Sequence, residues 1–267
     1  MKPVMMMVLG AALLAAVPAS AQDGAKARLE RSPRHQEWVK VTHGDRAVQS
    51  FIVYPEVKDK ATAVVVIHEI FGLSDWVRGV ADQLAEAGYI AIAPDLLSGM
   101  APEGGGTEAF SGRDSITRAV SALPADQVTA DVDAAIAYVR KVPACNGKVA
   151  VAGFCWGGGQ AFRLATVNPD LAAAFVFYGP GPNQEADIAR IRCPVYGFYG
   201  GNDARIGATI PTTSTLMKAA GKTYEPVTYE GAGHGFLRSG EEPGAKEADK
   251  KARDEAWERW KGLLKSI

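Results

Sequence analysis

The sequence predicts an α/β protein with a mostly parallel central sheet of about eight strands and helices on both faces. Short runs of β-branched and other apolar residues recur along the chain, as expected of strands buried on both faces. Amphipathic segments of helical period separate most of these runs. Glycine-rich and polar segments follow several of them, at the edge where such sheets bind ligands. The chain has 267 residues, of which 47% are hydrophobic, so it can bury a sizeable core.

Residues 1–21 are expected to be a secretory signal peptide. A positive start precedes an apolar run at 4–17, which is short for a membrane span, and Ala19-Ser20-Ala21 has the small-x-small pattern of a cleavage site. An uncleaved anchor is disfavoured because no stop-transfer pattern follows. We therefore expect cleavage before Gln22, a single domain over 22–267 without a stable membrane anchor, and export to the bacterial periplasm.

The net charge of −1 gives no reason to expect nucleic acid or anionic lipid as a partner. The expected partner is a small molecule, and the protein is expected to be monomeric.

The first elements are an edge hairpin and a βαβ unit. Residues 38–42 and 48–54 read as two strands, and His43 in the turn between them is expected at the surface. A β-branched run at 63–67 predicts a buried strand. After it come a loop, a helix from Ser74 or Asp75 to about residue 87, and another buried strand at 89–93.

The stretch 96–110 changes composition to Gly, Pro, Ser and Met. A segment of this length without periodicity is usually a functional loop or disordered. Because it follows a strand at the ligand-binding edge, the two expectations are a mobile rim of the active site and plain disorder.

The second half of the chain repeats the alternation. Helices are expected at 111–123, 125–141, from the glycine-rich turn to 167, at 211–220 and at 247–264, and strands at 148–153, 172–178, 194–199 and 224–229. In the C-terminal helix, Trp257, Trp260 and Leu264 fit one apolar face and predict core packing.

The strand at 148–153 runs into Gly153-Phe154-Cys155-Trp156-Gly157, and a helix follows at once. A strand, sharp turn and helix in this order predict a strained turn that lifts Cys155 toward solvent, with Gly153 and Gly157 lacking a Cβ where the two elements touch. The helix start directs free N–H groups at the thiol and favours its nucleophilic form. The alternative is a buried cysteine in an ordinary glycine-rich turn.

Cys145 and Cys193 each come just before a predicted strand. If the strand at 172–178 lies between theirs, the two residues are roughly 9.6 Å apart, beyond the ~7 Å reach of a disulfide. Three free thiols are therefore expected, including Cys155.

Two further side chains follow later strands. Asp203 comes after the strand at 194–199, and His234 lies in Gly233-His234-Gly235 after the strand at 224–229. Nucleophile, acid and histidine in this chain order are typical of the α/β-hydrolase fold. We expect Asp203 to orient His234, His234 to take the proton of Cys155, and the backbone N–H groups of Trp156 and Ile70 to form the oxyanion hole.

With these motifs, the sequence resembles the dienelactone hydrolases, also called carboxymethylenebutenolidases, over about residues 63–236. The resemblance rests on five segments: Glu69-Ile70-Phe71-Gly72, Gly88-Tyr89 with Ala93-Pro94-Asp95-Leu96, Gly153-Phe154-Cys155-Trp156-Gly157-Gly158, Gly201-Asn202-Asp203 and Gly233-His234-Gly235-Phe236. It implies a cysteine triad, no metal or cofactor, and hydrolysis of a carboxylated enol lactone.

The resemblance assigns further roles. It implies that Glu69 holds the resting thiol and accepts its proton when substrate binds, and that Arg238 pairs with the substrate carboxylate. Phe71, in the family's Glu-Ile-Phe-Gly loop, is a further substrate-binding candidate. The family's second arginine has no clear counterpart, and Arg113 and Arg118 lie in the corresponding region. His68 is expected to shape the pocket wall or the loop.

Other functions share parts of this pattern. A cysteine thioesterase, acyltransferase or peptidase would have the same triad with another pocket, and a non-enzymatic binding module would usually have lost triad members. A thiol-disulfide protein is disfavoured because there is no Cys-x-x-Cys, and a metal site because His68 and Glu69 are adjacent rather than at ligand spacing.

Overall fold

The computed structural model describes residues 21–267. The expected signal peptide lies outside the described residues except for its last position. No helix of residues 21–267 is long and apolar enough to cross a membrane.

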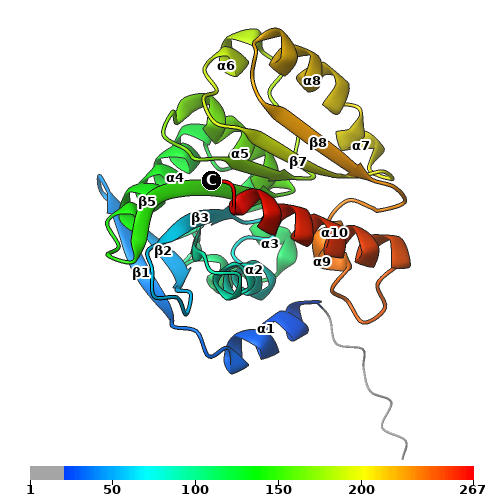
Figure 1. Ribbon diagram of the computed structural model, residues 1–267. Helices are drawn as coiled ribbons and strands as arrows, with labels where there is room; N and C mark the ends of the chain where they lie inside the picture. Colours follow the sequence, from blue (N-terminus) through cyan, green and yellow to red (C-terminus); the bar gives the residue numbers. More distant parts are fainter. Residues whose placement is uncertain (1–20) are drawn as a thin grey trace, which may run out of the picture.

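An eight-stranded sheet forms the centre of the molecule (Figure 1). Its strand order is β1-β2-β4-β3-β5-β6-β7-β8, with β1, β2 and β4 joined in antiparallel pairs and the other pairs parallel. The expected fold class is confirmed. The strands are β1 Gln36–His43, β2 Arg46–Val53, β3 Ala61–Ile67, β4 Ile90–Pro94, β5 Cys145–Phe154, β6 Ala174–Phe177, β7 Val195–Gly200 and β8 Tyr224–Tyr229.

Helices cover both faces of this sheet. On one face the core includes residues from α1 Ala21–Arg31, α2 Asp75–Glu86, α9 Phe236–Ser239 and α10 Glu247–Leu264. On the other it includes residues from α3 Arg113–Ser121, α4 Ala125–Arg140, α5 Trp156–Val167, α6 Glu185–Ala189, α7 Ala204–Gly207 and α8 Ile210–Ala219. Helix α1 is not among the elements expected from the sequence.

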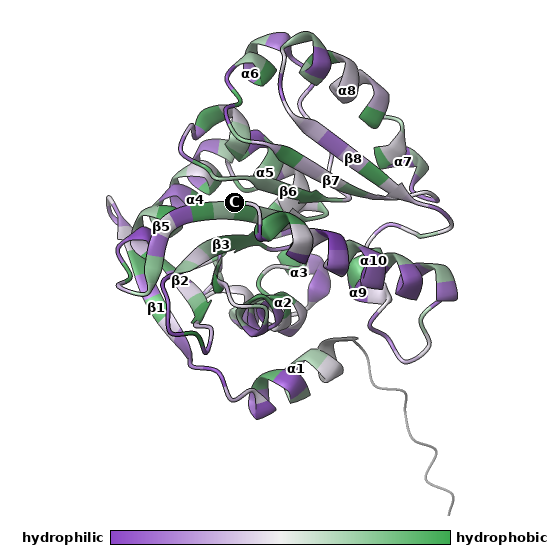
Figure 2. Ribbon diagram, in the orientation of Figure 1, coloured by the Kyte–Doolittle hydropathy of each residue, from purple (hydrophilic) through white to green (hydrophobic). Residues whose placement is uncertain are grey.

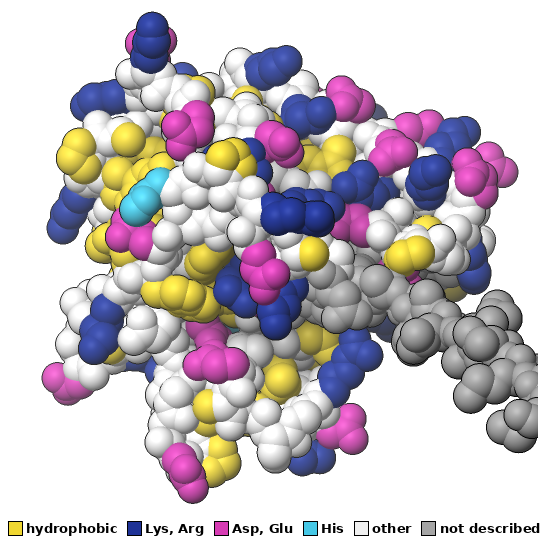
Figure 3. Space-filling model, turned by 90° about the horizontal axis from the view of Figure 1, so that it is seen from below, with side chains coloured by type: hydrophobic (Ala, Val, Ile, Leu, Met, Phe, Trp, Pro, Cys, Tyr) yellow, Lys and Arg dark blue, Asp and Glu magenta, His cyan; other side chains and the backbone are white. Residues whose placement is uncertain are grey.

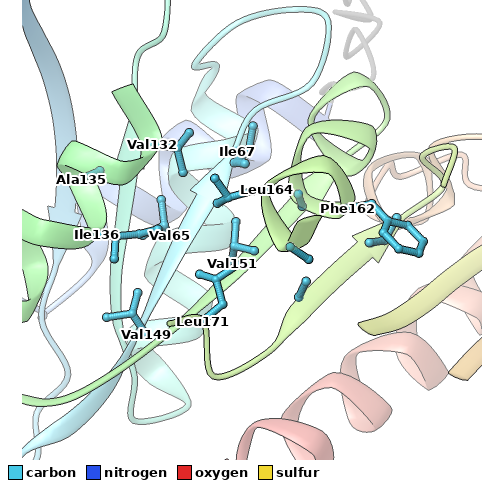
Figure 4. Close-up of a cluster of buried hydrophobic side chains, with 14 of the residues drawn as sticks. Val65, Ile67, Val132, Ala135, Ile136, Val149, Val151, Phe162, Leu164 and Leu171 are labelled. Atoms are coloured by element: carbon cyan, nitrogen blue, oxygen red, sulfur yellow. The ribbon is translucent and has the colours of Figure 1, made fainter. Parts of the chain in front are cut away.

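Two apolar cores result, one on each face of the sheet. Figure 4 shows part of the second, where strand side chains meet those of α4, α5 and the segment after α5: Val65, Ile67, Val132, Ala135, Ile136, Val149, Val151, Phe162, Leu164 and Leu171. In Figure 2 the central strands are mostly hydrophobic, while the outer helices alternate between hydrophobic and hydrophilic residues. In α10, Trp257, Trp260 and Leu264 are buried, which confirms the expected packing face.

One buried aspartate from each helical layer holds the edge hairpin β1–β2 or the segment directly before it. Asp82 of α2 accepts hydrogen bonds from Arg34, with 2.6 Å between Nη2 and Oδ2. On the opposite face, Asp131 of α4 pairs with Arg46 at 2.8 Å and with His43 at 2.6 Å. His43, expected at the surface, is instead partly buried, because the Asp131 carboxylate holds its ring.

The stretch 96–110 is folded, so the expectation of plain disorder is wrong. The buried Asp95 carboxylate accepts the backbone N–H of Thr107 at 2.7 Å and its hydroxyl at 2.7 Å. The same hydroxyl accepts the backbone N–H of Leu73 at 3.0 Å. Buried polar contacts of this kind fix the backbone, because breaking them leaves unpaired groups in the interior. That this rim moves stays a prediction.

The strand order agrees with the expectation for the cysteines. Strand β6 lies between β5, which begins at Cys145, and β7, which follows Cys193. All three cysteines are free thiols in the structure.

Candidate active site

Cys155 lies at the junction of β5 and α5, in a sharp turn with φ 54° and ψ −115°. A Cβ on Gly153 would lie 2.0 Å from the carbonyl oxygen of Gly157, and one on Gly157 would lie 2.3 Å from that of His68. The strained cysteine and the two glycines that its turn requires are therefore confirmed. The helix start leaves the first N–H groups of α5 without intrahelical acceptors beside the thiol.

Three side chains from separate loops meet at this turn. The Nε2 atom of His234 lies 3.1 Å from Sγ of Cys155, and its Nδ1 atom lies 2.5 Å from Oδ2 of Asp203. Asp203 also caps α7, since its Oδ1 atom accepts the N–H of Ile206 at 3.3 Å. The structure thus brings together the three residues that the chain order singled out.

The environment of His234 favours the protonated ring. Its hydrogen bond to Cys155, helped by that to Asp203, raises the pKa of His234 to about 9 against the opposing effect of desolvation. A third of the side chain is exposed, at 33%. A pKa of about 9 favours the imidazolium form at neutral pH, in which Nε2 can donate a hydrogen bond to the sulfur.

The loop that carries His234 is fastened by a residue that the sequence analysis did not single out. The buried Asp249, in the first turn of α10, accepts the N–H of Gly233 at 2.8 Å and the hydroxyl of Ser239 at 3.1 Å. On its other side, the carbonyl of Ala232 accepts the N–H of Asn202 at 2.9 Å. Helix α10 therefore positions the histidine relative to the loop after β7.

Glu69 is buried beside this group but does not pair with the thiol. Its Oε2 atom accepts a hydrogen bond from Nε of Arg238 at 3.0 Å, and Arg238 also lies 3.7 Å from Glu242. Burial raises the pKa of Glu69, although the guanidinium opposes the shift. The resting arrangement is thus Glu69 with Arg238 and Cys155 with His234, which differs from the Glu69–thiol pairing implied by the resemblance.

Tyr178 is a second residue missed at the sequence level. It follows β6 with φ 40°, its ring is fully buried, and the ring stands edge-on to His234 with 5.2 Å between centroids. Burial, together with the nearby Glu69 carboxylate, raises the pKa of its hydroxyl well above the usual value. A positive φ is uncommon for an aromatic residue, and no sequence signal announces it.

His68 supports the loop beside the thiol, as expected of it. It is fully buried, its Nδ1 atom lies 2.8 Å from the carbonyl oxygen of Glu69, and its ring stacks on Trp156 with 5.5 Å between centroids. Burial lowers the pKa of His68, so its imidazole is neutral.

Two cavities border the site. The first, of about 750 Å³, contains Cys155 and is lined by Ile70, Trp156, Gly159, Gln160, Arg163, Thr166, Val167, Tyr178, Pro180, Gly181, Pro182, Asp187, Arg190, Arg205 and Ile206. The second, of about 850 Å³, is lined by Trp38, Phe71, Leu73, Ser74, Asp75, Arg78, Thr107, Glu108, Phe110, Gly112, Arg113, Ile116, Arg238 and Glu242.

The expected substrate-binding residues gather at the second cavity. The guanidinium of Arg113 lies over the ring of Phe71 at 4.0 Å, and that of Arg238 lies 5.6 Å from the same ring. Arg118 lines neither cavity. Arg113 rather than Arg118 is thus placed with Arg238. In residues 21–267, no group of three or more His, Cys, Asp or Glu side chains is arranged to hold a metal ion.

Residues 48–267 match the model of the dienelactone hydrolase family. The chain belongs to that family. A Methylorubrum extorquens protein with the provisional name carboxymethylenebutenolidase is 32% identical over 209 residues, covering 74% of this chain and 71% of its own. The carboxymethylenebutenolidase of Pseudomonas putida is 31% identical over 193 residues, covering 70% of this chain and 80% of its own.

A solved structure supports the same assignment. The crystal structure of a provisionally named dienelactone hydrolase from Klebsiella pneumoniae subsp. pneumoniae superposes with a TM-score of 0.76 at 26% identity, over 88% of this chain and 99% of its own. The family member described here is therefore a carboxylic ester hydrolase with the α/β-hydrolase fold.

Proposed function

We propose that this dienelactone hydrolase family member cleaves ester or enol-lactone bonds through a Cys155-His234-Asp203 triad. The observation that carries the proposal is the continuous line of hydrogen bonds from sulfur to imidazole to carboxylate, at 3.1 Å and 2.5 Å. A nucleophile, a base and a group that orients the base are the parts that acyl transfer needs.

In the first step the sulfur of Cys155 attacks the substrate carbonyl carbon. The carbonyl oxygen gains negative charge, and we infer that the backbone N–H groups of Trp156 and Ile70 stabilise it. When the tetrahedral intermediate collapses, the bond to the leaving oxygen breaks and His234 gives that oxygen a proton from Nε2. The products are a thioester on Cys155 and an alcohol or enol.

The second step is hydrolysis of the thioester. His234, now neutral, takes a proton from a water molecule while the water oxygen attacks the acyl carbon. Collapse of the intermediate breaks the carbon–sulfur bond and releases the acid. Asp203 keeps the ring in the required tautomer through Nδ1 in both steps.

The ion pair between Glu69 and Arg238 suggests how a carboxylated substrate engages the site. A substrate carboxylate that binds Arg238 competes with Glu69 for the guanidinium. Glu69 is then left as a buried carboxylate beside His234 with a raised pKa, and therefore with a greater tendency to accept a proton.

Hydrolysis of 4-nitrophenyl acetate and of a carboxylated enol lactone by the purified protein tests the proposal. We expect turnover of both in reducing buffer, and a loss of at least about a thousandfold in Cys155→Ala, since the covalent path is removed. Cys193→Ala is the matched control. Cys193 precedes β7, at the edge of the sheet opposite to the site, so this variant should retain activity. Equal turnover by Cys155→Ala and the wild type would refute the triad.

For localisation, we propose export with cleavage before Gln22, on the pattern of residues 1–21. Mass spectrometry of the protein from a periplasmic fraction should give a chain that begins at Gln22. A chain found only in the cytoplasm with its first residues intact would contradict export.

A further inference from the structure

The cavity that contains Cys155 is large and mostly apolar. At about 750 Å³ it is in the range of sites for drug-sized ligands, roughly 300–1,000 Å³. Its walls include Trp156, Pro180, Pro182, Ile206 and Val167, the last of which is 43% exposed. A hydrophobic wall that begins at the reacting sulfur favours an apolar segment attached to the scissile bond.

Three arginines also line this cavity, and two of them are already engaged. Arg163 donates to the carbonyl of Ala125 at 2.9 Å and to Asp126 at 3.0 Å. Arg190 donates to Asp187 at 2.6 Å and to the carbonyl of Thr166 at 3.1 Å. Asp187, the cavity's acidic residue, is therefore already paired.

Arg205 is the exception. It is exposed, it lines the cavity, and it makes no hydrogen bond or ion pair with any of residues 21–267. Its helix α7 is preceded by Asp203, whose carboxylate caps that helix and also holds His234. The backbone of Arg205 is thus tied to Asp203, and its side chain has no partner of opposite charge among residues 21–267.

We propose that Arg205 binds an anionic group at the far end of the substrate part that occupies the cavity of Cys155. The substrate class is an ester with an apolar segment between the scissile carbonyl and a terminal carboxylate or similar anion. This proposal rests on Cys155 as the nucleophile and concerns a different anion site from that of Arg238, which lines the other cavity.

The size and charge of the cavity together carry this assignment. An apolar wall without a cation would accept any hydrophobic ester, and the engaged arginines add no free charge. An unpaired guanidinium presents a planar set of donors that matches a carboxylate bidentately, so it adds a preference for anionic substrates. Because Arg205 is exposed, that preference should weaken as ionic strength rises.

Matched neutral and anionic esters test the proposal by kinetics. One pair, 4-nitrophenyl hexanoate and mono-4-nitrophenyl adipate, carries the anion on the acyl side, and another, hexyl acetate and 6-acetoxyhexanoate, carries it on the alcohol side. In at least one pair we expect kcat/KM to be about tenfold higher for the anionic member at low salt. Arg205→Gln should remove this ratio, Arg205→Lys should keep part of it, and Arg192→Gln, the same change at a distant edge, should leave it at the wild-type value.

A binding measurement on an inactive variant tests the role of Arg205 independently of catalysis. Calorimetry with Cys155→Ala covers both sides, with monomethyl adipate against methyl hexanoate and 6-acetoxyhexanoate against hexyl acetate. In the pair that discriminates in kinetics, the anionic ligand should bind about tenfold more tightly than the neutral one, and Arg205→Gln in that background should abolish the difference. Ratios in both ester pairs that are the same in wild type and Arg205→Gln overturn the inference while the triad stands. Discrimination in binding without Cys155-dependent turnover would support Arg205 and refute the triad.

Discussion

His234 lies between a sulfur and a carboxylate that both favour its protonated form. We expect its pKa, measured by NMR on ¹⁵N-histidine-labelled protein, to be about 9 and to fall toward 6.5 in Cys155→Ala, since the bond to Cys155 is the largest cause of the shift. Cys193→Ala should leave the value unchanged. A His234 pKa that is the same with and without Cys155 would contradict the assigned cause.

The sign of this shift also predicts the pH dependence of stability. A histidine whose pKa is raised on folding stabilises the folded state fully below its unfolded value of 6.5, and that contribution is lost as the pH rises through about 9. The free energy of unfolding of His234→Gln should therefore fall less between these two pH values than that of the wild type.

Glu69 and Arg238 form the second pair whose roles are open to test. Glu69→Gln keeps the shape of the side chain and removes its capacity to accept a proton. We expect turnover of a carboxylated lactone to fall by about a hundredfold, the scale of general acid–base effects, and the pH dependence of Cys155 alkylation to change. Glu255→Gln, which changes an exposed acid in α10 that lines neither cavity, is the control. Unchanged turnover and alkylation in Glu69→Gln would remove Glu69 from the mechanism.

At the scale of elements, the turn between β5 and α5 requires glycine, because a Cβ has no room beside the neighbouring backbone. A Cβ on Gly157 would lie 2.3 Å from one backbone oxygen and 2.5 Å from another, and neither can move without displacing β3. Gly157→Ala should destabilise the protein by about 3 kcal/mol or more. Gly262→Ala in α10, where a Cβ meets nothing within 4 Å, should instead be neutral or stabilising by about 0.5–1 kcal/mol. Chemical denaturation of the two variants compares them directly.

Elements with a strong period were predictable from the sequence. The run 63–67 has no polar residue and predicts a buried strand, which β3 is. Helix α1 was not predictable, because it has few apolar residues and its packing rests on the buried Ala25 against Gly79 of α2. The second antiparallel pair, β2 with β4, likewise depends on tertiary order rather than on local pattern.

The candidate site likewise contains residues that could be predicted from the sequence and others that could not. The proximity of Cys155, Asp203 and His234 could be predicted from the sequence, because each follows a strand in a parallel sheet and such strand ends share one edge. Tyr178, Asp249 and the two cavities depend on how side chains from distant segments pack, which no local pattern records. The pairing of Glu69 with Arg238 was not predicted, because the resemblance assigned Glu69 to the thiol and Arg238 to the substrate carboxylate.

At the scale of the whole molecule, the net charge is close to zero. In Figure 3, basic and acidic side chains are interspersed over most of the face shown, in keeping with the net charge of −1. The charges that matter for stability are the few in the interior, above all those that fasten the edge hairpin and the segment directly before it to the two helical layers.

Removing one member of such a buried pair should therefore cost much more than removing a surface pair. The side chain of Asp82 is 0% exposed and that of Arg34 is 12% exposed. Arg34→Met leaves the carboxylate without its cation and should destabilise the fold by about 3 kcal/mol. Lys251→Met breaks an exposed pair with Glu255 in α10 and should change stability by less than about 1 kcal/mol. Thermal or urea unfolding measures both, and equal effects would contradict this role of the buried pair.

The contact of Asp249 with the loop before His234 has a consequence for biosynthesis. The ribosome makes β3, β5 and β7 before α10, yet the N–H of Gly233 and the hydroxyl of Ser239 find their acceptor only when α10 docks. The histidine loop of a nascent chain that ends before Glu247 lacks this anchor, whatever the state of its sheet. A chain truncated before Glu247 should therefore form the sheet without the fastened histidine loop, so completion of the site depends on the last helix of the chain.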